Sequence, residues 1–276
     1  MITDSQIHLW VMPPELPRPD RPEDHQAKYP DGFRGEQMIA RMDEIGVHRA
    51  VVTPPGFRPD GIYPREQAAR YPGRIAIMDR FDVAAPEGPR RLRELKREPH
   101  VIGIRLNMRS PAVRHWLEPC GIDWFWAECE TLDIPVTVLV GPLSNRMGWV
   151  AERHPGLSIT IDHMGRVADV KGAAAFGGMD QLLTLAPYEN VGVKVSSVPD
   201  SSAEDYPYRD VYDGVKRVYD VFGPERMLWG SDLSGLTVSY RDCLRHFQQG
   251  LDFLSRSDKE WILGKSLAKF YRWPEI

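Results

Sequence analysis

The chain has little cysteine and no long apolar run, and both shortages narrow what it can be. Its three cysteines, Cys120, Cys129 and Cys243, are scattered and form no CxxC pair, which predicts reduced thiols rather than disulfides or a zinc cluster. No stretch approaches the roughly 18 apolar residues of a membrane span. The first residues carry no basic segment followed by an apolar run. We therefore expect a cytoplasmic protein that does not bind membranes.

An excess of charge of either sign is also missing. The net charge of −4 and the isoelectric point near 6.1 give no general attraction for nucleic acid. The expected partner is a small-molecule substrate, and the sequence leaves homo-oligomer formation open. The chain has no glycine-rich fingerprint after its first strand and no Gly-x-Ser-x-Gly elbow. These absences argue against a dinucleotide-binding sheet and against Ser-His-Asp acyl transfer.

Apolar, β-branched runs recur eight times along the 276 residues. Stretches with helical spacing separate them, for example residues 38–45 and 211–222. Such alternation predicts parallel strands covered by helices, and eight units predict a single (β/α)8 TIM barrel spanning residues 1–276. The predicted strands are residues 2–9, 50–53, 75–81, 101–106, 136–140, 157–161, 191–195 and 227–229.

The connections between these elements are unequal in length. Three long loops, residues 11–34, 166–178 and 196–208, follow the carboxyl ends of strands, whereas turns such as residues 44–47 and 153–156 precede strands and are short. Long loops on one face of a barrel supply the walls of an active site. We therefore expect the site at the carboxyl ends of the strands.

Polar side chains appear where the apolar runs stop. In the first strand, Gln6 and His8 alternate with Ile7 and Leu9, so the polar pair should face one side. The same rule adds polar residues from four later strands, and together the candidates are Gln6, His8, Arg105, Asn107, Asp162, His163, Lys194, Ser196 and Asp232.

Two arginines belong to this set or follow it closely. Arg105 lies in a strand that should be buried, so its guanidinium needs an anion, either a substrate carboxylate or a structural acid. Arg166 follows His163 by three residues, at the start of a long loop. Trp10, Tyr206 and Tyr208 lie in loops of the same face, where they either contact a substrate ring or pack on one another.

The strand-end motifs resemble one family in their order and spacing. The motifs are Asp4-x-Gln6-x-His8, Asp162-His163-Met164-Gly165-Arg166, Lys194-Val195-Ser196 and Gly230-Ser231-Asp232. Together they resemble the amidohydrolase-2 branch of the amidohydrolase superfamily over the whole chain. Within that branch they resemble the metal-independent group that includes 2-pyrone-4,6-dicarboxylate lactonase and the sugar-acid lactonases and isomerases. The resemblance implies hydrolysis of a small carboxylated or polar lactone, or of a similarly activated cyclic ester or amide, in small-molecule catabolism.

The chain departs from the metal-dependent members at two ligand positions. Gln6 stands where the first strand usually carries a histidine, and Leu139 stands near the ligand histidine of the fifth strand. Carboxamides and aliphatic side chains are poor zinc ligands. We therefore predict no cofactor. His8, His163 and Asp232 remain as three possible ligands, so the alternative is an enzyme with one zinc or manganese ion.

The resemblance makes Asp232 the residue that activates water, with His163 and His8 as the other catalytic residues. Arg105 and Arg166 would hold the substrate or stabilise the developing oxyanion. The remaining expected substrate contacts are Gln6, Asn107, Lys194, Ser196, Trp10 and Tyr208. Two alternatives stay open: a zinc-dependent decarboxylase or hydrolase of the same superfamily, and a barrel that binds a small molecule without catalysis.

Overall fold

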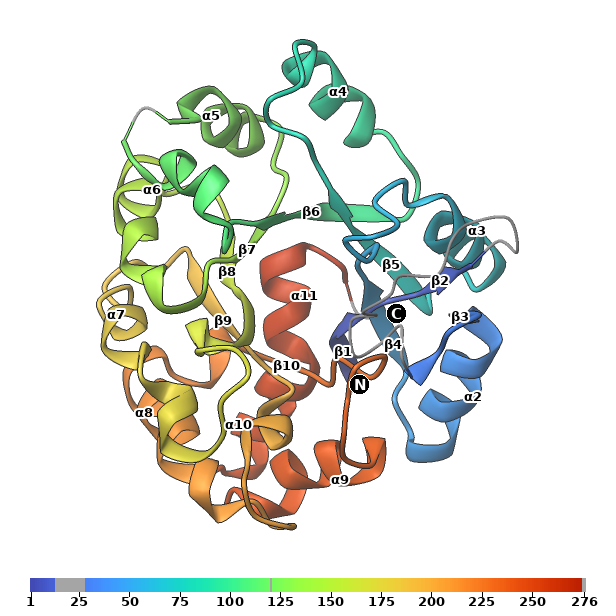
Figure 1. Ribbon diagram of the computed structural model, residues 1–276, viewed down its shortest axis with the longest axis vertical. Coiled ribbons are helices and arrows are strands. Elements are labelled where there is room, and N and C mark those ends of the chain that lie inside the picture. Colours follow the sequence, from blue (N-terminus) through green and yellow to red (C-terminus); the bar gives the residue numbers. More distant parts are fainter. Residues whose placement is uncertain (13–27, 120, 275–276) are drawn as a thin grey trace.

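The computed structural model describes residues 1–12, 28–119 and 121–274. Eight parallel strands follow one another around a single curved sheet in the order of the chain (Figure 1). This confirms the predicted (β/α)8 barrel, and each strand lies within or overlaps one of the predicted runs. The strands are β1 (Thr3–Ile7), β4 (Arg49–Val52), β5 (Ile75–Arg80), β6 (Val101–Asn107), β7 (Val136–Leu139), β8 (Ile159–Ile161), β9 (Val191–Ser196) and β10 (Met227–Gly230).

The helices that follow the strands cover the outside of this sheet (Figure 1). The predicted helices at residues 38–45 and 211–222 are both present. The α-helices are α2 (Gly35–Ile45), α3 (Ile62–Arg70), α4 (Gly88–Leu95), α5 (Asp123–Thr131), α6 (Gly148–Arg153), α7 (Met179–Leu183), α8 (Tyr212–Phe222), α9 (Tyr240–Arg245), α10 (Arg256–Glu260) and α11 (Ser266–Tyr271). In the part of the chain that the structure describes, no helix is long and apolar enough to cross a membrane.

One loop prediction and one cysteine prediction extend beyond the described residues. In the long loop at residues 11–34, residues 13–27 lie outside them, and its ends form an antiparallel pair, β2 (Trp10–Val11) with β3 (Gly32–Phe33). Cys120 also lies outside them. Cys129 and Cys243 are free and buried, as the scattered spacing predicted, and burial raises the pKa of both thiols well above the usual value.

The first and last strands meet through side chains. Among the described strands, β1 and β10 form no ladder with each other. Instead, the carboxylate of Asp4 accepts hydrogen bonds from the backbone N–H (2.9 Å) and the hydroxyl of Ser231 and from Tyr240 Oη (2.9 Å), and the N–H of Asp232 donates to the carbonyl of Gln6 (2.9 Å). The pairing of β1 with β4 also shifts its register between Asp4 and Ile7. The seam therefore holds the backbone of Ser231 and Asp232 against β1.

The C-terminal helix α11 fills the amino-terminal half of the barrel. It lies at the centre of the ring of strands in Figure 1. The hydroxyl of Tyr271 is 3.0 Å from those of both Thr137 and Thr160, and Gly192 leaves room for the ring of Phe270, since a Cβ there would come within 2.9 Å of it. Further apolar contacts join Leu267 and Phe270 to Val51, Met78 and Leu228. These contacts pack the amino-terminal half of the barrel, so we expect the ligand site at the carboxyl ends of the strands.

Candidate active site

The predicted polar residues converge at the carboxyl ends of the strands. Two cavities of about 410 and 200 Å³ adjoin there, and both are lined by Arg109, Leu139, His163 and Asp232. Of the predicted residues, those that line at least one cavity are His8, Arg105, Asn107, Asp162, His163, Arg166 and Asp232. Gln6, Lys194 and Ser196 are fully buried and contact these lining residues.

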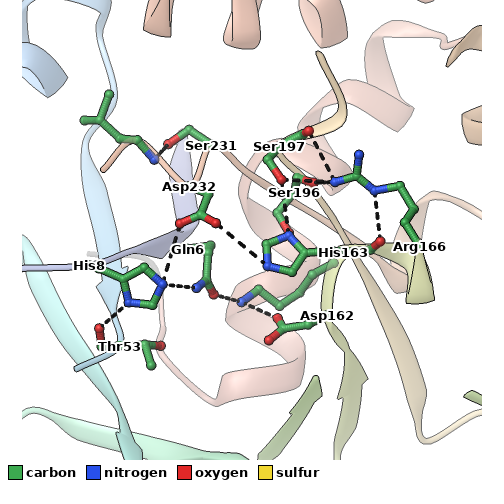
Figure 2. A network of polar contacts seen from close by, with 12 residues as sticks. Gln6, His8, Thr53, Asp162, His163, Arg166, Ser196, Ser197, Ser231 and Asp232 are labelled. Carbon is green, nitrogen blue, oxygen red and sulfur yellow. Dashed lines mark hydrogen bonds and ion pairs between the residues drawn. The ribbon is translucent and has the colours of Figure 1, made fainter. Parts of the chain in front are cut away.

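Asp232 lies between the two histidines (Figure 2). Its Oδ1 is 3.6 Å from His8 Nε2, and its Oδ2 is 3.9 Å from His163 Nε2. These distances exceed a hydrogen bond. Although the side chain as a whole is partly exposed, Oδ1 is buried and receives no hydrogen bond from any of the described residues. A buried carboxylate oxygen in this state needs a donor from a bound molecule.

Strained backbone presents two of these side chains. Asp232 follows β10 by two residues with φ of 56°, and His163 lies two residues beyond β8 with φ of 50°. His163 belongs to a left-handed turn that continues through Met164 and Gly165, with φ values of 55° and 60°. Non-glycine residues rarely adopt this region, and such strain concentrates at functional sites.

His163 is neutral at physiological pH. Burial lowers its pKa to about 4, although Asp162 and Asp232 oppose the shift. Its Nδ1 lies 2.9 Å from Ser196 Oγ and 3.2 Å from Ser197 Oγ, and these contacts orient the ring with Nε2 toward Asp232.

A directed chain of hydrogen bonds fixes His8. Lys194 Nζ donates to Gln6 Oε1, so the Gln6 amide turns its nitrogen toward His8 Nε2, 3.1 Å away. The other ring nitrogen, Nδ1, lies 2.7 Å from the carbonyl oxygen of Thr53, which can only accept. The proton of His8 is therefore on Nδ1, and its Nε2 accepts from Gln6.

Asp162 is buried between two cations. Arg105 Nε bonds its Oδ2, and Lys194 Nζ lies 2.8 Å from its Oδ1. Burial alone would raise the pKa of Asp162, but the two cations outweigh burial and hold that pKa below the usual range. One nitrogen of Arg105 thus makes the structural ion pair that the sequence left open, while the side chain still lines the smaller cavity.

Arg166 donates hydrogen bonds to three backbone carbonyls. Its Nε donates to the carbonyl of His163 (3.0 Å), and its Nη2 to those of Ser196 (2.7 Å) and Ser197 (3.2 Å). Burial lowers its pKa to about 10, which leaves it cationic at neutral pH. Arg166 therefore ties the His163 turn to β9 and also forms part of the wall of the larger cavity.

The structure places the predicted aromatic contacts elsewhere. Trp10 is buried and packs edge-on against Tyr29 and Phe57, while Tyr208 packs edge-on against Tyr206 and His246. Neither Trp10 nor Tyr208 lines the two cavities. The alternative of aromatic loop packing describes both.

Sequence reasoning missed two arginines of the smaller cavity. Arg80 is the last residue of β5, so the strand-end rule would have found it; its Nε donates to the carbonyl of Pro54 (2.6 Å). Arg109 follows β6 by two residues in an irregular loop, is exposed, and lines both cavities. No periodic pattern distinguishes Arg109 from other surface arginines.

Comparison with known proteins agrees with this geometry. The model of the family described as Amidohydrolase matches residues 3–273. The chain belongs to this amidohydrolase family. It is therefore an enzyme of the hydrolase class. An L-fucono-1,5-lactonase from Burkholderia ambifaria is 28% identical, with 98% of this chain and 94% of the relative covered.

Solved structures of the superfamily share its fold. A zinc-bound amidohydrolase from Burkholderia multivorans superposes with a TM-score of 0.82 at 20% identity, covering 99% of this chain and 100% of the other. A probable 2-pyrone-4,6-dicarboxylic acid hydrolase from Acinetobacter baumannii, with citric acid bound, has a TM-score of 0.78 at 19% identity, covering 98% and 99%.

Zinc in one of these structures raises the question whether this site fits a metal ion. Among the described residues, no group of three or more His, Cys, Asp or Glu side chains is arranged to hold one. His8 Nε2 already accepts from the Gln6 amide, and Lys194 places a cation directly behind that amide. Leu139 adds an aliphatic wall to both cavities. These donors do not fit a resident zinc or manganese ion.

Proposed function

We propose that this enzyme opens the ring of a small lactone that carries a carboxylate or another polar group, and that it needs no metal ion. The observation that carries the proposal is the buried, donorless Oδ1 of Asp232 at the wall shared by the two cavities. That oxygen can accept the proton of a water molecule. The lactonase relative and the pyrone hydrolase, whose named substrate is also a cyclic ester, support this substrate class.

The reaction then needs one base and one set of donors. Water attacks the lactone carbonyl carbon while Asp232 takes one of its protons, which forms a tetrahedral oxyanion. The ring carbon–oxygen bond breaks next, and the proton passes from Asp232 to the departing alkoxide oxygen. The product is a hydroxy acid whose new carboxyl group releases its proton, the second proton of the attacking water, to solvent, and Asp232 returns to its starting state.

Cationic side chains suit the charges of such a substrate. Arg105 and Arg109 line the smaller cavity beside His163 and Asp232. A donor that hydrogen-bonds the oxyanion lowers the activation free energy by about 3 to 4 kcal/mol. Arg109 has no acidic partner within the described structure and is the best placed to hold a substrate carboxylate.

The test is turnover of a matched panel. We would offer carboxylated lactones, the same rings without a carboxylate, an acyclic ester and an aromatic carboxylic acid, and follow release of acid and of carbon dioxide. We expect ring opening of lactones, fastest for the carboxylated ones. Release of carbon dioxide without ring opening would favour the decarboxylase alternative, and tight binding without turnover would favour a binding protein.

A further inference from the structure

We propose that Gln6, held by Lys194, is a positioning residue that keeps His8 neutral with its proton on Nδ1, so that His8 donates no hydrogen bond to Asp232. Asp232 thereby remains an unneutralised base. The inference rests on the proposed function only where it names Asp232 as that base. The hydrogen-bond pattern around His8 stands independently of any substrate.

The direction of the hydrogen bonds from Lys194 through Gln6 to His8 follows from groups that can only donate. Lys194 is in an ion pair with Asp162, so its ammonium donates, and the atom of Gln6 that faces it must be the oxygen. The Gln6 nitrogen then faces His8 Nε2 at 3.1 Å. Because an amide nitrogen only donates, Nε2 must be the unprotonated nitrogen of His8.

The alternative protonation state would disable the proposed base. If Nε2 carried a proton, it would face Asp232 Oδ1 at 3.6 Å, and a small rotation would complete an imidazolium–carboxylate pair. The surroundings within the described residues oppose that charge: the cationic side chains that line the same cavity or lie behind Gln6 are Arg80, Arg105, Arg109 and Lys194, and the carboxylates are those of Asp162 and Asp232. The neighbouring cations already disfavour a positively charged His8, and Gln6 adds a hydrogen bond that keeps Nε2 unprotonated.

Nitrogen-15 NMR of the histidine rings tests the pattern in the wild-type enzyme and without any substrate. In wild-type enzyme at pH 7, we expect His8 to show one protonated nitrogen, Nδ1, and one unprotonated nitrogen, Nε2. The signals are assigned by their loss in His8→Gln. A wild-type His8 with a protonated Nε2 would overturn the proposal. This result stands even if no lactone in the panel is turned over.

A variant tests the consequence for the reaction. Gln6→Glu keeps the shape but places a carboxylate oxygen against Nε2, so His8 should carry protons on both nitrogens at pH 7. We expect kcat at pH 7 to fall at least 10-fold with little change in KM, and to recover toward the wild-type value as pH rises and His8 loses the added proton. Gln181→Glu adds the same charge on the exposed surface and should leave both the spectrum and the profile unchanged.

A second variant keeps the test valid if Gln6→Glu folds poorly. Gln6→Met removes the amide bond to Nε2 without adding charge, so His8 becomes able to pair with Asp232. We expect a lower kcat at pH 7 and the same recovery at higher pH. If the folded variant or variants keep the wild-type pH profile, Gln6 has only a structural role and the proposal fails.

Discussion

Replacing Asp232 with asparagine separates its chemistry from its shape. The amide keeps the size and hydrogen-bonding capacity of the side chain but cannot take a proton from water. Loss of a general base lowers kcat by about 10² to 10⁴-fold. Since each tenfold change is about 1.4 kcal/mol, we expect the barrier to rise by at least roughly 2.7 kcal/mol. No described side chain lies within hydrogen-bond distance of Oδ1 to replace it.

The structure also predicts what Asp232→Asn leaves unchanged. Asparagine tolerates the left-handed backbone at this position, and the bond from the N–H of residue 232 to the Gln6 carbonyl is kept, so the variant should fold. KM should change little because Arg105 and Arg109 are intact. Asp133→Asn is the matched control: its φ is 53°, but it lies in the turn before β7, where its carboxylate pairs with Arg272 at the opposite end of the barrel.

Initial rates of acid release over a range of lactone concentrations give kcat and KM for both variants, and thermal unfolding reports folding. An Asp232→Asn enzyme with a near wild-type kcat would refute the assignment. Water would then be activated elsewhere, and His163 would be the next candidate, since its Nε2 lies 3.9 Å from Asp232.

The remaining predictions concern the arginines and the pH dependence of stability. Arg105→Met should lower the free energy of unfolding by about 3 kcal/mol because buried Asp162 loses one partner. Arg109→Met should leave that free energy unchanged and raise KM for a carboxylated lactone about tenfold. Equal stability losses in the two variants, or an unchanged KM in Arg109→Met, would contradict these roles. Burial lowers the pKa of His246 to about 4 from 6.5, so the unfolded chain binds a proton between these values that the folded one does not, and stability falls as pH falls. Denaturant titrations at pH 7 and pH 5 give the free energy of unfolding of wild type and of His246→Gln. Between these pH values the variant should lose about 2 kcal/mol less of this free energy than wild type, and equal losses would refute the lowered pKa of His246.

The barrel and its polar centre could be predicted because parallel strands impose a simple rule. Side chains at their carboxyl ends converge whatever the sequence between them. Gln6, His8, Arg105 and Lys194 therefore came together as expected. Alternation along a strand was enough to find them.

The partner that each side chain bonds or packs against could not be predicted in the same way. The sequence left open whether Arg105 holds a substrate anion or a structural acid; its Nε bonds Asp162, 57 residues away, and no local pattern indicates that pairing. Arg109 was missed because its position depends on an irregular loop. Trp10 lies in the short strand β2 and Tyr208 in the loop after β9, and each packs against other aromatic rings away from the two cavities.

The central claim is lactone hydrolysis by the chain's own carboxylate and cations, and one measurement tests it most directly. The rate of lactone ring opening and the metal content should be determined in the same sample, before and after chelation. We predict an unchanged kcat when zinc and manganese fall well below one equivalent per chain, because His8 Nε2 is already bonded to Gln6 and Leu139 lines both cavities with an aliphatic side chain. A kcat that falls in proportion to the metal removed, and returns when zinc is added back, would contradict the account.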